Sequence, residues 1–177
     1  MPDAPNVVPP MVFKVLIQGT LADVWHEITR TDSPIPAFFN SQMHVKELKA
    51  GSKLAMRTGN GKYTGVVGKI LECEEPHRFV HTFRFTNFDD PECLVAYDLV
   101  EIDGGVEFTL TVTDYADGTK TAKQMNQGGS MIVNTLKAVL ETGRPSFGTR
   151  LLFVLFKVLE PISPKKCRSE NWPIDGE

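Results

Sequence analysis

Two side chains, His81 and Tyr97, have the clearest capacity for chemistry at a binding site. They lie in runs where apolar residues alternate with others, from Phe79 to Phe85 and from Leu94 to Ile102. Because successive side chains of a strand point to opposite faces, each residue shares a face with apolar neighbours. An apolar pocket with a few convergent polar groups is the usual form of a small-molecule site. The alternative is a filled core in which both side chains are hydrogen-bonded.

His81 is also a candidate catalyst. With Tyr97 it could act as a general acid or base, as a cyclase or hydrolase requires, but no spacing places a third group that would orient the imidazole. His77 lies four residues earlier. On a strand that spacing is roughly 13 Å, too far for one metal ion. We therefore predict no metal site and no cofactor, and we rank catalysis by His81 below ligand binding.

A long amphipathic helix over 121–143 must cover these strands. Its apolar residues recur at three- and four-residue spacing, which is the period of a helix with one buried stripe. Gly143 and Pro145 end it. The pair Gly128 and Gly129 interrupts the stripe, although each glycine costs about 1 kcal/mol relative to alanine in a helix. The pair indicates either a kink or a place where bulk is unwelcome.

The rest of the pattern up to residue 113 predicts about seven strands, mostly antiparallel. The first covers Val12 to Gln18, and two short helices follow it, one capped by Thr20 and one over Ile35 to Phe39. The next strand is predicted from Val45 to Leu48. We expect an α+β domain in which an antiparallel sheet is closed by the long helix.

The chain divides into three parts. Residues 1–11 are expected to be a flexible lead, residues 12–143 a single domain, and residues 144–177 an extension that begins with an apolar helix over 147–160. That helix is apolar nearly all round, so it could pack on its own domain, form a homodimer with a second copy, or make weak contact with a membrane. We favour packing or dimerisation, because a membrane-surface helix normally has a strongly polar face.

The composition excludes several classes of protein. The formal net charge is −3, so nothing indicates a nucleic-acid partner. The three cysteines are an odd number without CxxC spacing, which favours reduced thiols in a cytoplasmic protein. The N-terminus has an acidic residue and several prolines before any apolar run, unlike a signal peptide. The longest apolar run, Leu151 to Phe156, is much shorter than the roughly 20 residues that span a bilayer.

Several phrases of the sequence, in this order, resemble a known family. They are Leu21-Ala22-Asp23-Val24-Trp25, Gly65, Pro76-His77-Arg78-Phe79-Val80, Thr82-Phe83, Tyr97-Asp98-Leu99, and the closing Leu136-Lys137 and Leu140-Glu141. Over residues 12–143 the chain resembles the START-like (SRPBCC) superfamily, in the branch related to the 90-kDa heat-shock-protein ATPase activator. The resemblance implies a helix-grip fold, with a curved antiparallel sheet, two short helices after the first strand and a long helix over the sheet. The family includes ligand carriers, cyclases and co-chaperones.

Two positions depart from the family pattern. The family usually has a tryptophan early in the last helix, where this chain has Gly129, and often one on a strand, where it has Phe83. Both changes reduce bulk, so either the cavity is larger or another side chain fills the space.

The resemblance and the alternation together predict an aromatic-walled cavity between the sheet and the long helix. We expect it to bind an apolar small molecule or lipid. The alternatives are a co-chaperone-like interaction module with a filled core, and a cyclase- or hydrolase-type enzyme. The residues expected to line the cavity are Phe38, Phe39, Phe79, His81, Phe83, Phe85, Tyr97, Phe108, Leu110, Met125, Gly129, Ile132 and Leu136.

Overall fold

Seven strands form one antiparallel sheet in the order β1-β7-β6-β5-β4-β3-β2. The computed structural model describes residues 8–177; residues 1–7 of the predicted lead lie outside that range. The strands are β1 (Met11–Ile17), β2 (Gln42–Val45), β3 (Lys53–Arg57), β4 (Thr64–Glu74), β5 (Arg78–Phe85), β6 (Cys93–Ile102) and β7 (Gly105–Thr113). The predicted helix-grip fold of class α+β is confirmed.

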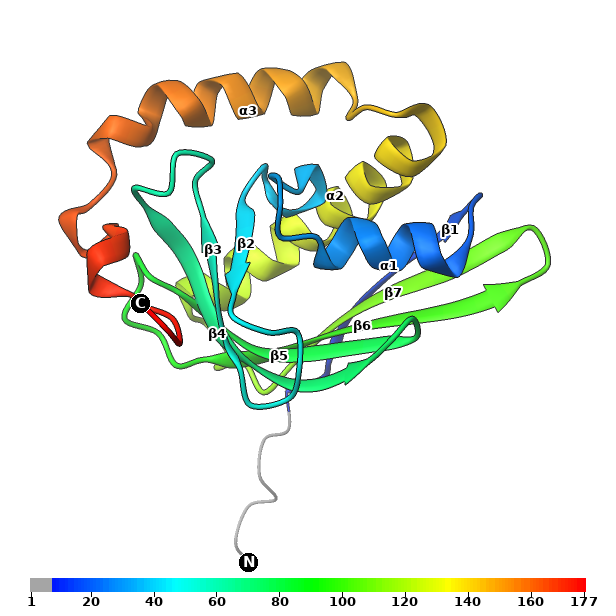
Figure 1. Cartoon of the computed structure of the whole chain (residues 1–177), viewed down its shortest axis with the longest axis horizontal. Helices are drawn as coiled ribbons and strands as arrows, with labels where there is room; N and C mark the ends of the chain where they lie inside the picture. The colour runs from blue at the N-terminus through cyan, green and yellow to red at the C-terminus, as the bar shows by residue number, and fades with distance from the viewer. Residues whose placement is uncertain (1–7) are drawn as a thin grey trace, which may run out of the picture.

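The sheet curves around its contents (Figure 1). The register shifts between Met56 and Arg57 and again between Ile70 and Glu72, and such bulges bend and twist a strand pair. The prediction for β2 was wrong, because β2 ends at Val45, where the sequence pattern placed its start. Met43 supplies its buried side chain, and the following polar residues form a turn.

Three helical segments cover the concave face. The two short ones that follow β1 are α1 (Leu21–Thr29) and the 3₁₀ turn η1 (Pro36–Phe38), as predicted. The long helix α2 (Lys120–Thr142) packs against β1 and η1. It begins at Thr119, whose hydroxyl accepts a hydrogen bond from the Ala122 amide, and ends at Gly143 in the left-handed conformation, an ordinary helix end.

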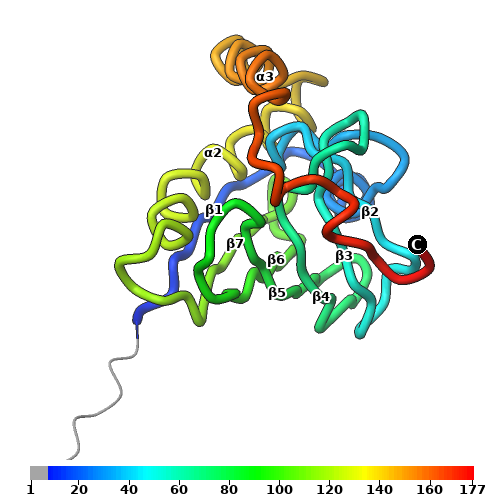
Figure 2. Tube along the Cα trace, turned by 90° about the vertical axis from the view of Figure 1, so that its left-hand side faces the viewer, coloured from blue at the N-terminus to red at the C-terminus, as the bar shows by residue number. Residues whose placement is uncertain are grey.

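The extension consists of helix α3 (Phe147–Leu159) and a C-terminal strap, residues 160–177. Helix α3 crosses above η1 in Figure 1 and contains no buried residue. Figure 2, which views α3 nearly end-on, shows it standing away from the body. The 3₁₀ turns η2 (Glu160–Ile162), η3 (Lys165–Cys167) and η4 (Ser169–Asn171) then carry the chain back to the sheet. No helix in residues 8–177 combines the length and apolar character needed to cross a membrane.

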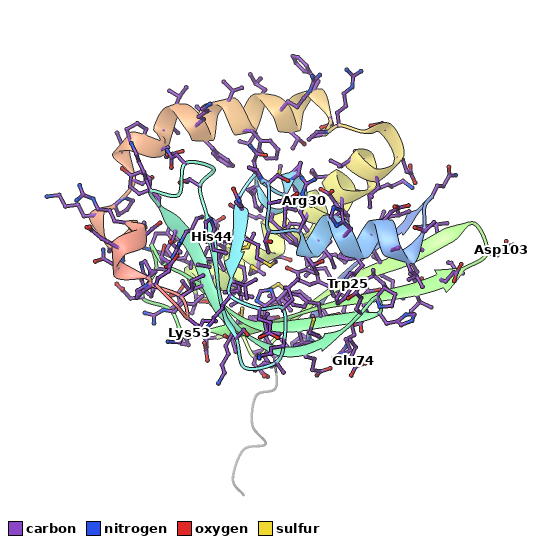
Figure 3. The ribbon with its side chains drawn as sticks, in the orientation of Figure 1. Trp25, Arg30, His44, Lys53, Glu74 and Asp103 are labelled. Carbon is purple, nitrogen blue, oxygen red and sulfur yellow. The ribbon has the colours of Figure 1, made fainter. Side chains whose placement is uncertain are left out.

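Figure 3 shows how side chains fill the concave face. Trp25 projects from α1 toward the sheet and meets Phe79 edge-on, with ring centroids 6.2 Å apart. Asp103 marks the tip of the β6–β7 hairpin, at the end of the sheet opposite the C-terminal strap. The core under α1 is therefore filled by packed aromatic side chains.

Candidate ligand-binding cavity

A cavity of about 530 Å³ lies between the sheet, η1, α2 and the extension. Ten of the expected residues line it, and they come from η1, three strands and α2. These are Phe38, Phe39, His81, Phe83, Phe85, Tyr97, Leu110, Met125, Gly129 and Ile132. Their role in binding a ligand stays a prediction, but the structure brings all ten to one space.

The other three expected residues, Phe79, Phe108 and Leu136, lie outside the cavity lining. Each is fully buried in the core. Phe79 packs between Trp25 and Tyr97, and Phe108 stacks on Tyr97 at a centroid distance of 5.9 Å. Strand alternation placed Phe79 and Phe108 on the correct face, and helical spacing placed Leu136 on the buried side of α2, but these side chains are packed in the filled part of the core.

The strand register explains which side chains meet. Phe79 of β5 lies opposite Tyr97 of β6, Tyr97 opposite Leu110 of β7, and Leu110 opposite Phe13 of β1. Neighbouring strands thus present one row of side chains across the concave face. His81 lies opposite Val95 in the next row. The two polar side chains, His81 and Tyr97, are therefore neighbours, with ring centroids 5.8 Å apart.

His81 is held in one tautomer by the backbone. Its Nδ1 lies 2.7 Å from the Thr82 carbonyl oxygen, which can only accept, so Nδ1 carries the proton and Nε2 offers a lone pair. Burial lowers the pKa of His81 to about 4, although the bond to Thr82 acts in the opposite direction. At neutral pH the imidazole is an uncharged acceptor.

Gly68 of β4 makes this arrangement sterically feasible. A Cβ atom at that position would lie 1.9 Å from the Thr82 carbonyl oxygen and 3.3 Å from His81 Nδ1. Any side chain at position 68 would therefore displace the carbonyl that fixes the imidazole. The glycine in the β4 sequence was a signal of close backbone approach, but sequence alone could not connect it to His81.

Tyr97 is the second polar side chain that could bind a ligand. Its side chain is buried, and burial raises the pKa of its phenol well above the ordinary value. Among the described residues its hydroxyl makes no hydrogen bond to the protein, and Nε2 of His81 also has no such partner. Neither atom is one of the side-chain nitrogen and oxygen atoms that lack both a hydrogen bond and any contact with open space. Both are therefore available to a molecule in the cavity.

The lining contains no Asp, Glu, Lys or Arg side chain among the described residues. Its polar members are hydroxyl and amide groups, the thiol of Cys167 and the imidazole of His81, whose lowered pKa keeps it uncharged at pH 7. An ion entering this space would lose its hydration without gaining a counter-ion, which is costly. The cavity favours an uncharged ligand.

Gly129 lies in the cavity lining and also leaves room for a neighbouring aromatic ring. A Cβ atom there would lie 2.2 Å from Cε2 of Phe13. Of the two alternatives, the second holds: another side chain, Phe13, occupies the space that the family's tryptophan would fill. The helix also runs unbroken through the glycine pair, so the pair causes no break, and only Gly129 marks a place where bulk is unwelcome.

Sequence reasoning missed the contribution of the extension. Leu152 and Phe156 of α3 and Ser163, Pro164 and Cys167 of the strap line the same cavity. Phe156 lies over Phe39, with ring centroids 6.4 Å apart. The apolar character of 147–160 indicated a partner surface, but no local pattern could identify that surface as the mouth of the cavity.

The mouth is defined by the exposed members of the lining. They come from the end of η1, β4, the β5–β6 loop, α2 and the extension: Phe39, Gly65, Asn87, Gln124, Gln127, Phe156 and Pro164. The entrance thus combines polar amides with aromatic and proline side chains. A ligand would enter past α3.

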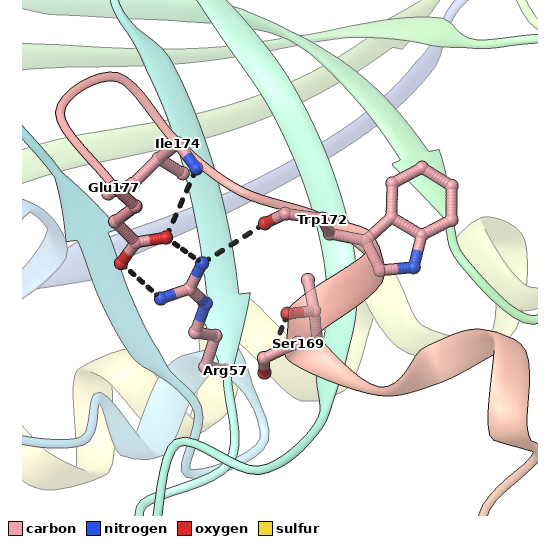
Figure 4. A network of polar contacts seen from close by, with 6 residues as sticks. Arg57, Ser169, Trp172, Ile174 and Glu177 are labelled. Atoms are coloured by element: carbon pink, nitrogen blue, oxygen red, sulfur yellow. Dashed lines mark hydrogen bonds and ion pairs between the residues drawn. The ribbon is translucent and has the colours of Figure 1, made fainter.

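The strap is fastened to the sheet by a polar network (Figure 4). Arg57 of β3 donates to both carboxylate oxygens of Glu177 at 2.7 Å and to the Trp172 carbonyl at 3.0 Å. Thr64 donates to Ser169 at 3.0 Å. Tyr63 and Arg168 form an isolated antiparallel bridge. These contacts hold the extension against the cavity from the side of β3 and β4.

Of the other reactive groups, His77, Cys73 and Cys93 lie outside the cavity lining, and Cys167 belongs to it. His77 precedes β5 and faces the Leu99 carbonyl at 3.4 Å, outside the lining. Within residues 8–177 no three His, Cys, Asp or Glu side chains come together as a metal site needs. The thiols of Cys73, Cys93 and Cys167 are free.

Comparison with known proteins places the chain by sequence. The family model described as "Activator of Hsp90 ATPase homolog 1-like protein" matches residues 6–141. That match covers well over half of the chain and stops before α3. No curated protein matches the sequence.

Several solved structures share the fold. DynU16, from the dynemicin biosynthetic locus, has a TM-score of 0.63 and 19% identity, over 77% of this chain and 48% of that chain. CalU16 from Micromonospora echinospora has a TM-score of 0.62 and 17% identity, over 85% and 88%. The Aha1 dimer from Colwellia psychrerythraea has a TM-score of 0.63 and 13% identity, over 77% and 98%. The chain spans about half the length of DynU16, and at these identities the likeness concerns the fold alone.

Proposed function

Because this chain belongs to the family of Activator of Hsp90 ATPase homolog 1-like proteins, whose helix-grip fold leaves room between sheet and helix, we propose that it binds an uncharged, largely apolar small molecule. The observation that carries the proposal is the cavity of about 530 Å³, to whose lining residues 8–177 contribute no Asp, Glu, Lys or Arg side chain. That volume lies in the ordinary range of small-molecule sites.

The proposed mechanism is burial with orientation. Aromatic and aliphatic walls remove apolar ligand surface from water, at about 25 cal/mol per Å². Nε2 of His81 accepts a hydrogen bond from a ligand hydroxyl or amide, and the Tyr97 hydroxyl donates to a ligand oxygen. Because neither group has a protein partner among the described residues, a ligand that supplies both gains two hydrogen bonds without breaking any in the protein.

Binding is favoured over catalysis for a specific reason. His81 is the strongest candidate base, but its pKa of about 4 makes it a weak one at neutral pH. The group that orients it is a backbone carbonyl, and the described part of the lining has no carboxylate to stabilise an imidazolium. The geometry suits recognition of a neutral polar group.

The proposal is tested first by native mass spectrometry of the purified protein, with extraction and identification of whatever is released. The second test is titration with N-phenyl-1-naphthylamine, an uncharged dye that fluoresces in apolar surroundings. Ile132→Trp adds bulk inside the lining and should weaken dye binding at least about tenfold. Ile102→Trp places the same side chain on an exposed part of β6 and should change nothing.

The outcomes separate the alternatives. Saturable dye binding that is lost only in Ile132→Trp supports the cavity. Binding that both variants retain, or dye that never binds in the absence of a co-purified molecule, contradicts it. The folded state of each variant is checked by circular dichroism, so that loss of binding is not confused with unfolding.

A second candidate function is a co-chaperone-like interaction module. The family description favours it, as does the exposed apolar surface of α3. It predicts that the chain stimulates the ATPase of an Hsp90-type chaperone, with or without a filled cavity. Steady-state ATPase measurements with and without the chain test this directly, and an unchanged rate contradicts it.

A further inference from the structure

Helix α3 exposes more apolar surface than a lone surface helix can leave in water. Eight of its own and following side chains are between 43% and 77% exposed, while none of its residues is buried. They are Phe147, Leu151, Val154, Leu155, Phe156, Val158, Leu159 and Ile162. Contiguous exposed apolar surface of this kind marks a site for a protein or membrane partner.

The helix is apolar on two sides for two different reasons. Leu152 and Phe156 face the cavity and belong to its lining. Phe147, Leu151 and Val154 do not line the cavity and are at least 60% exposed. The absence of a polar face, which argued against a membrane-surface helix, is thus explained: one side of α3 closes the cavity, and the outer side is unpartnered in the described chain.

The charge around α3 identifies the kind of partner. The segment 144–168 has a net charge of +5, whereas the whole chain has −3. The rest of the chain is therefore strongly acidic. The charged side chains of the segment are Arg144, Arg150, Lys157, Glu160, Lys165, Lys166 and Arg168. Lys166 lies 3.4 Å from Asp89 and Arg168 lies 3.8 Å from Glu170, whereas Arg144, Arg150, Lys157 and Lys165 form no ion pair among the described residues. Unpaired basic side chains in the same segment as exposed leucine, valine and phenylalanine complement an anionic lipid surface, to which each basic residue contributes about 1 kcal/mol of attraction.

We propose that the outer face of α3, with the unpaired basic residues Arg144, Arg150, Lys157 and Lys165, docks on the surface of an anionic phospholipid bilayer. Apolar side chains of the outer face enter the headgroup boundary, and the lysines and arginines meet lipid phosphates. Because Leu152 and Phe156 border the cavity on the inner side, docking places the mouth of the cavity beside the bilayer. The docking itself does not depend on the proposed ligand.

A second copy of the chain fits the same surface less well. An α3–α3 contact would bring two segments of charge +5 together, and like charges repel across an interface. A phospholipid surface supplies the opposite charge. A dimer through α3 is therefore the outcome that would replace this proposal.

The experiment is co-sedimentation of the full chain with vesicles of phosphatidylcholine, with or without phosphatidylglycerol. We expect binding to the anionic vesicles, at least about tenfold weaker binding to the neutral ones, and a loss of binding as salt is raised. Val154→Glu, on the outer face, should weaken binding to anionic vesicles at least about tenfold. Val100→Glu is the matched control, since Val100 is 51% exposed on β6 and Val154 60% exposed on α3.

Three results would overturn the proposal: no binding of the wild-type chain to anionic vesicles, equal binding to both vesicle types, or equal binding by Val154→Glu. Light scattering could instead show that the wild-type chain is a dimer, that it does not bind vesicles and that Val154→Glu dissociates it. That result would assign the surface to a second copy of the chain. Dye binding by the same variants is measured separately. Its retention in Val154→Glu shows that the cavity is intact and that only docking has been lost.

Discussion

Phe13 of β1 occupies the space that Gly129 leaves open in α2. A Cβ atom at position 129 would lie 2.2 to 2.5 Å from three atoms of the Phe13 ring. Phe13 stands opposite Leu110 in the strand register, so the contact joins the last helix to the row of side chains that includes Tyr97. The close approach of α2 to β1 therefore fixes one wall of the cavity.

We predict that Gly129→Ala destabilises the protein. Alanine gains about 1 kcal/mol of helix propensity over glycine, but overpacking at a buried contact costs about 1–3 kcal/mol. Because the obstacle is an aromatic ring held between a strand and a helix, the second effect should prevail. The free energy of unfolding, measured in urea, should fall by about 1 kcal/mol or more.

Gly128→Ala is the matched control for that prediction. A Cβ atom at position 128 would lie 3.4 Å from the tip of Phe39, which is an ordinary contact. This variant should be neutral or more stable by up to about 1 kcal/mol. Combining Gly129→Ala with Phe13→Leu should recover part of the loss. Equal effects of alanine at the two glycines would show that the Phe13 contact does not govern stability.

Local patterns were sufficient to predict much of the fold. The alternation in β5 placed Phe79, His81, Phe83 and Phe85 on one face, and their rings do form a chain with centroids 4.8 to 6.3 Å apart. The three- and four-residue spacing gave α2, with Gly143 as its end. Both signals arise from the geometry of a single element, so they are legible without knowledge of the rest of the chain.

The contacts that could not be predicted from the sequence depend on how the strands and helices are placed relative to one another. That Phe13 meets Gly129 requires β1 to pair with β7 at one particular offset. That Phe79 is core while Phe83 lines the cavity depends on where α1 ends over the sheet. The position of the extension over the mouth is set by contacts more than a hundred residues apart, such as Arg57 with Glu177.

The neutral state of His81 predicts a pH dependence of stability. Its pKa is about 4 in the fold, against an ordinary value of 6.5. Between these values the unfolded chain binds the proton and the folded chain does not, so stability is full above pH 6.5 and falls as the pH drops toward 4. The loss attributable to His81 is on the order of 3 kcal/mol at pH 4.

Urea unfolding at a series of pH values measures this dependence. His81→Phe should be less stable than the wild type at pH 7 and should lose less stability on acidification. His44 also has a lowered pKa, chiefly from burial, so His44→Phe serves as the comparison for a less buried imidazole. A wild-type stability that is flat from pH 7 to pH 4.5, or an imidazole NMR titration of His81 near pH 6.5, would contradict the assignment.

The free polar atoms of the cavity predict a preference among uncharged ligands. 2-Naphthol and naphthalene differ by one hydroxyl, which Nε2 of His81 can accept. A hydrogen bond of this kind contributes about 1 kcal/mol net, so the wild type should bind 2-naphthol roughly fivefold more tightly than naphthalene. His81→Phe should abolish the preference while it retains affinity for naphthalene, as measured by competition with the dye.

Tyr97→Phe isolates the second polar side chain. Because the Tyr97 hydroxyl has no protein partner among the described residues, its removal should leave the free energy of unfolding within about 0.5 kcal/mol. It should weaken the binding of a carbonyl ligand such as 2-acetylnaphthalene several-fold relative to naphthalene. Tyr115→Phe, whose hydroxyl donates to the Pro9 carbonyl outside the cavity, should leave the ratio unchanged. A ratio that Tyr115→Phe alters equally would place the effect outside the cavity.

The contact between Arg57 and Glu177 should govern how firmly the strap is held. The hydrogen bonds from Arg57 lower the pKa of Glu177 to about 2, so the attachment is complete above pH 4.5 and is lost as the pH falls toward 2. Glu177→Gln leaves the buried Arg57 guanidinium without its carboxylate, which is unfavourable, and hydrogen exchange in residues 163–177 should rise while α2 stays protected. Glu170→Gln is the matched control, since the Glu170 side chain is 72% exposed and its contact with Arg168 is long, at 3.8 Å.

The Glu177→Gln variant should also change ligand release. Because the strap borders the cavity, release of the strap should speed dissociation of the dye in stopped-flow measurements. An exchange pattern in Glu177→Gln that matches the wild type would mean that the Trp172 and Ser169 contacts hold the strap without the ion pair.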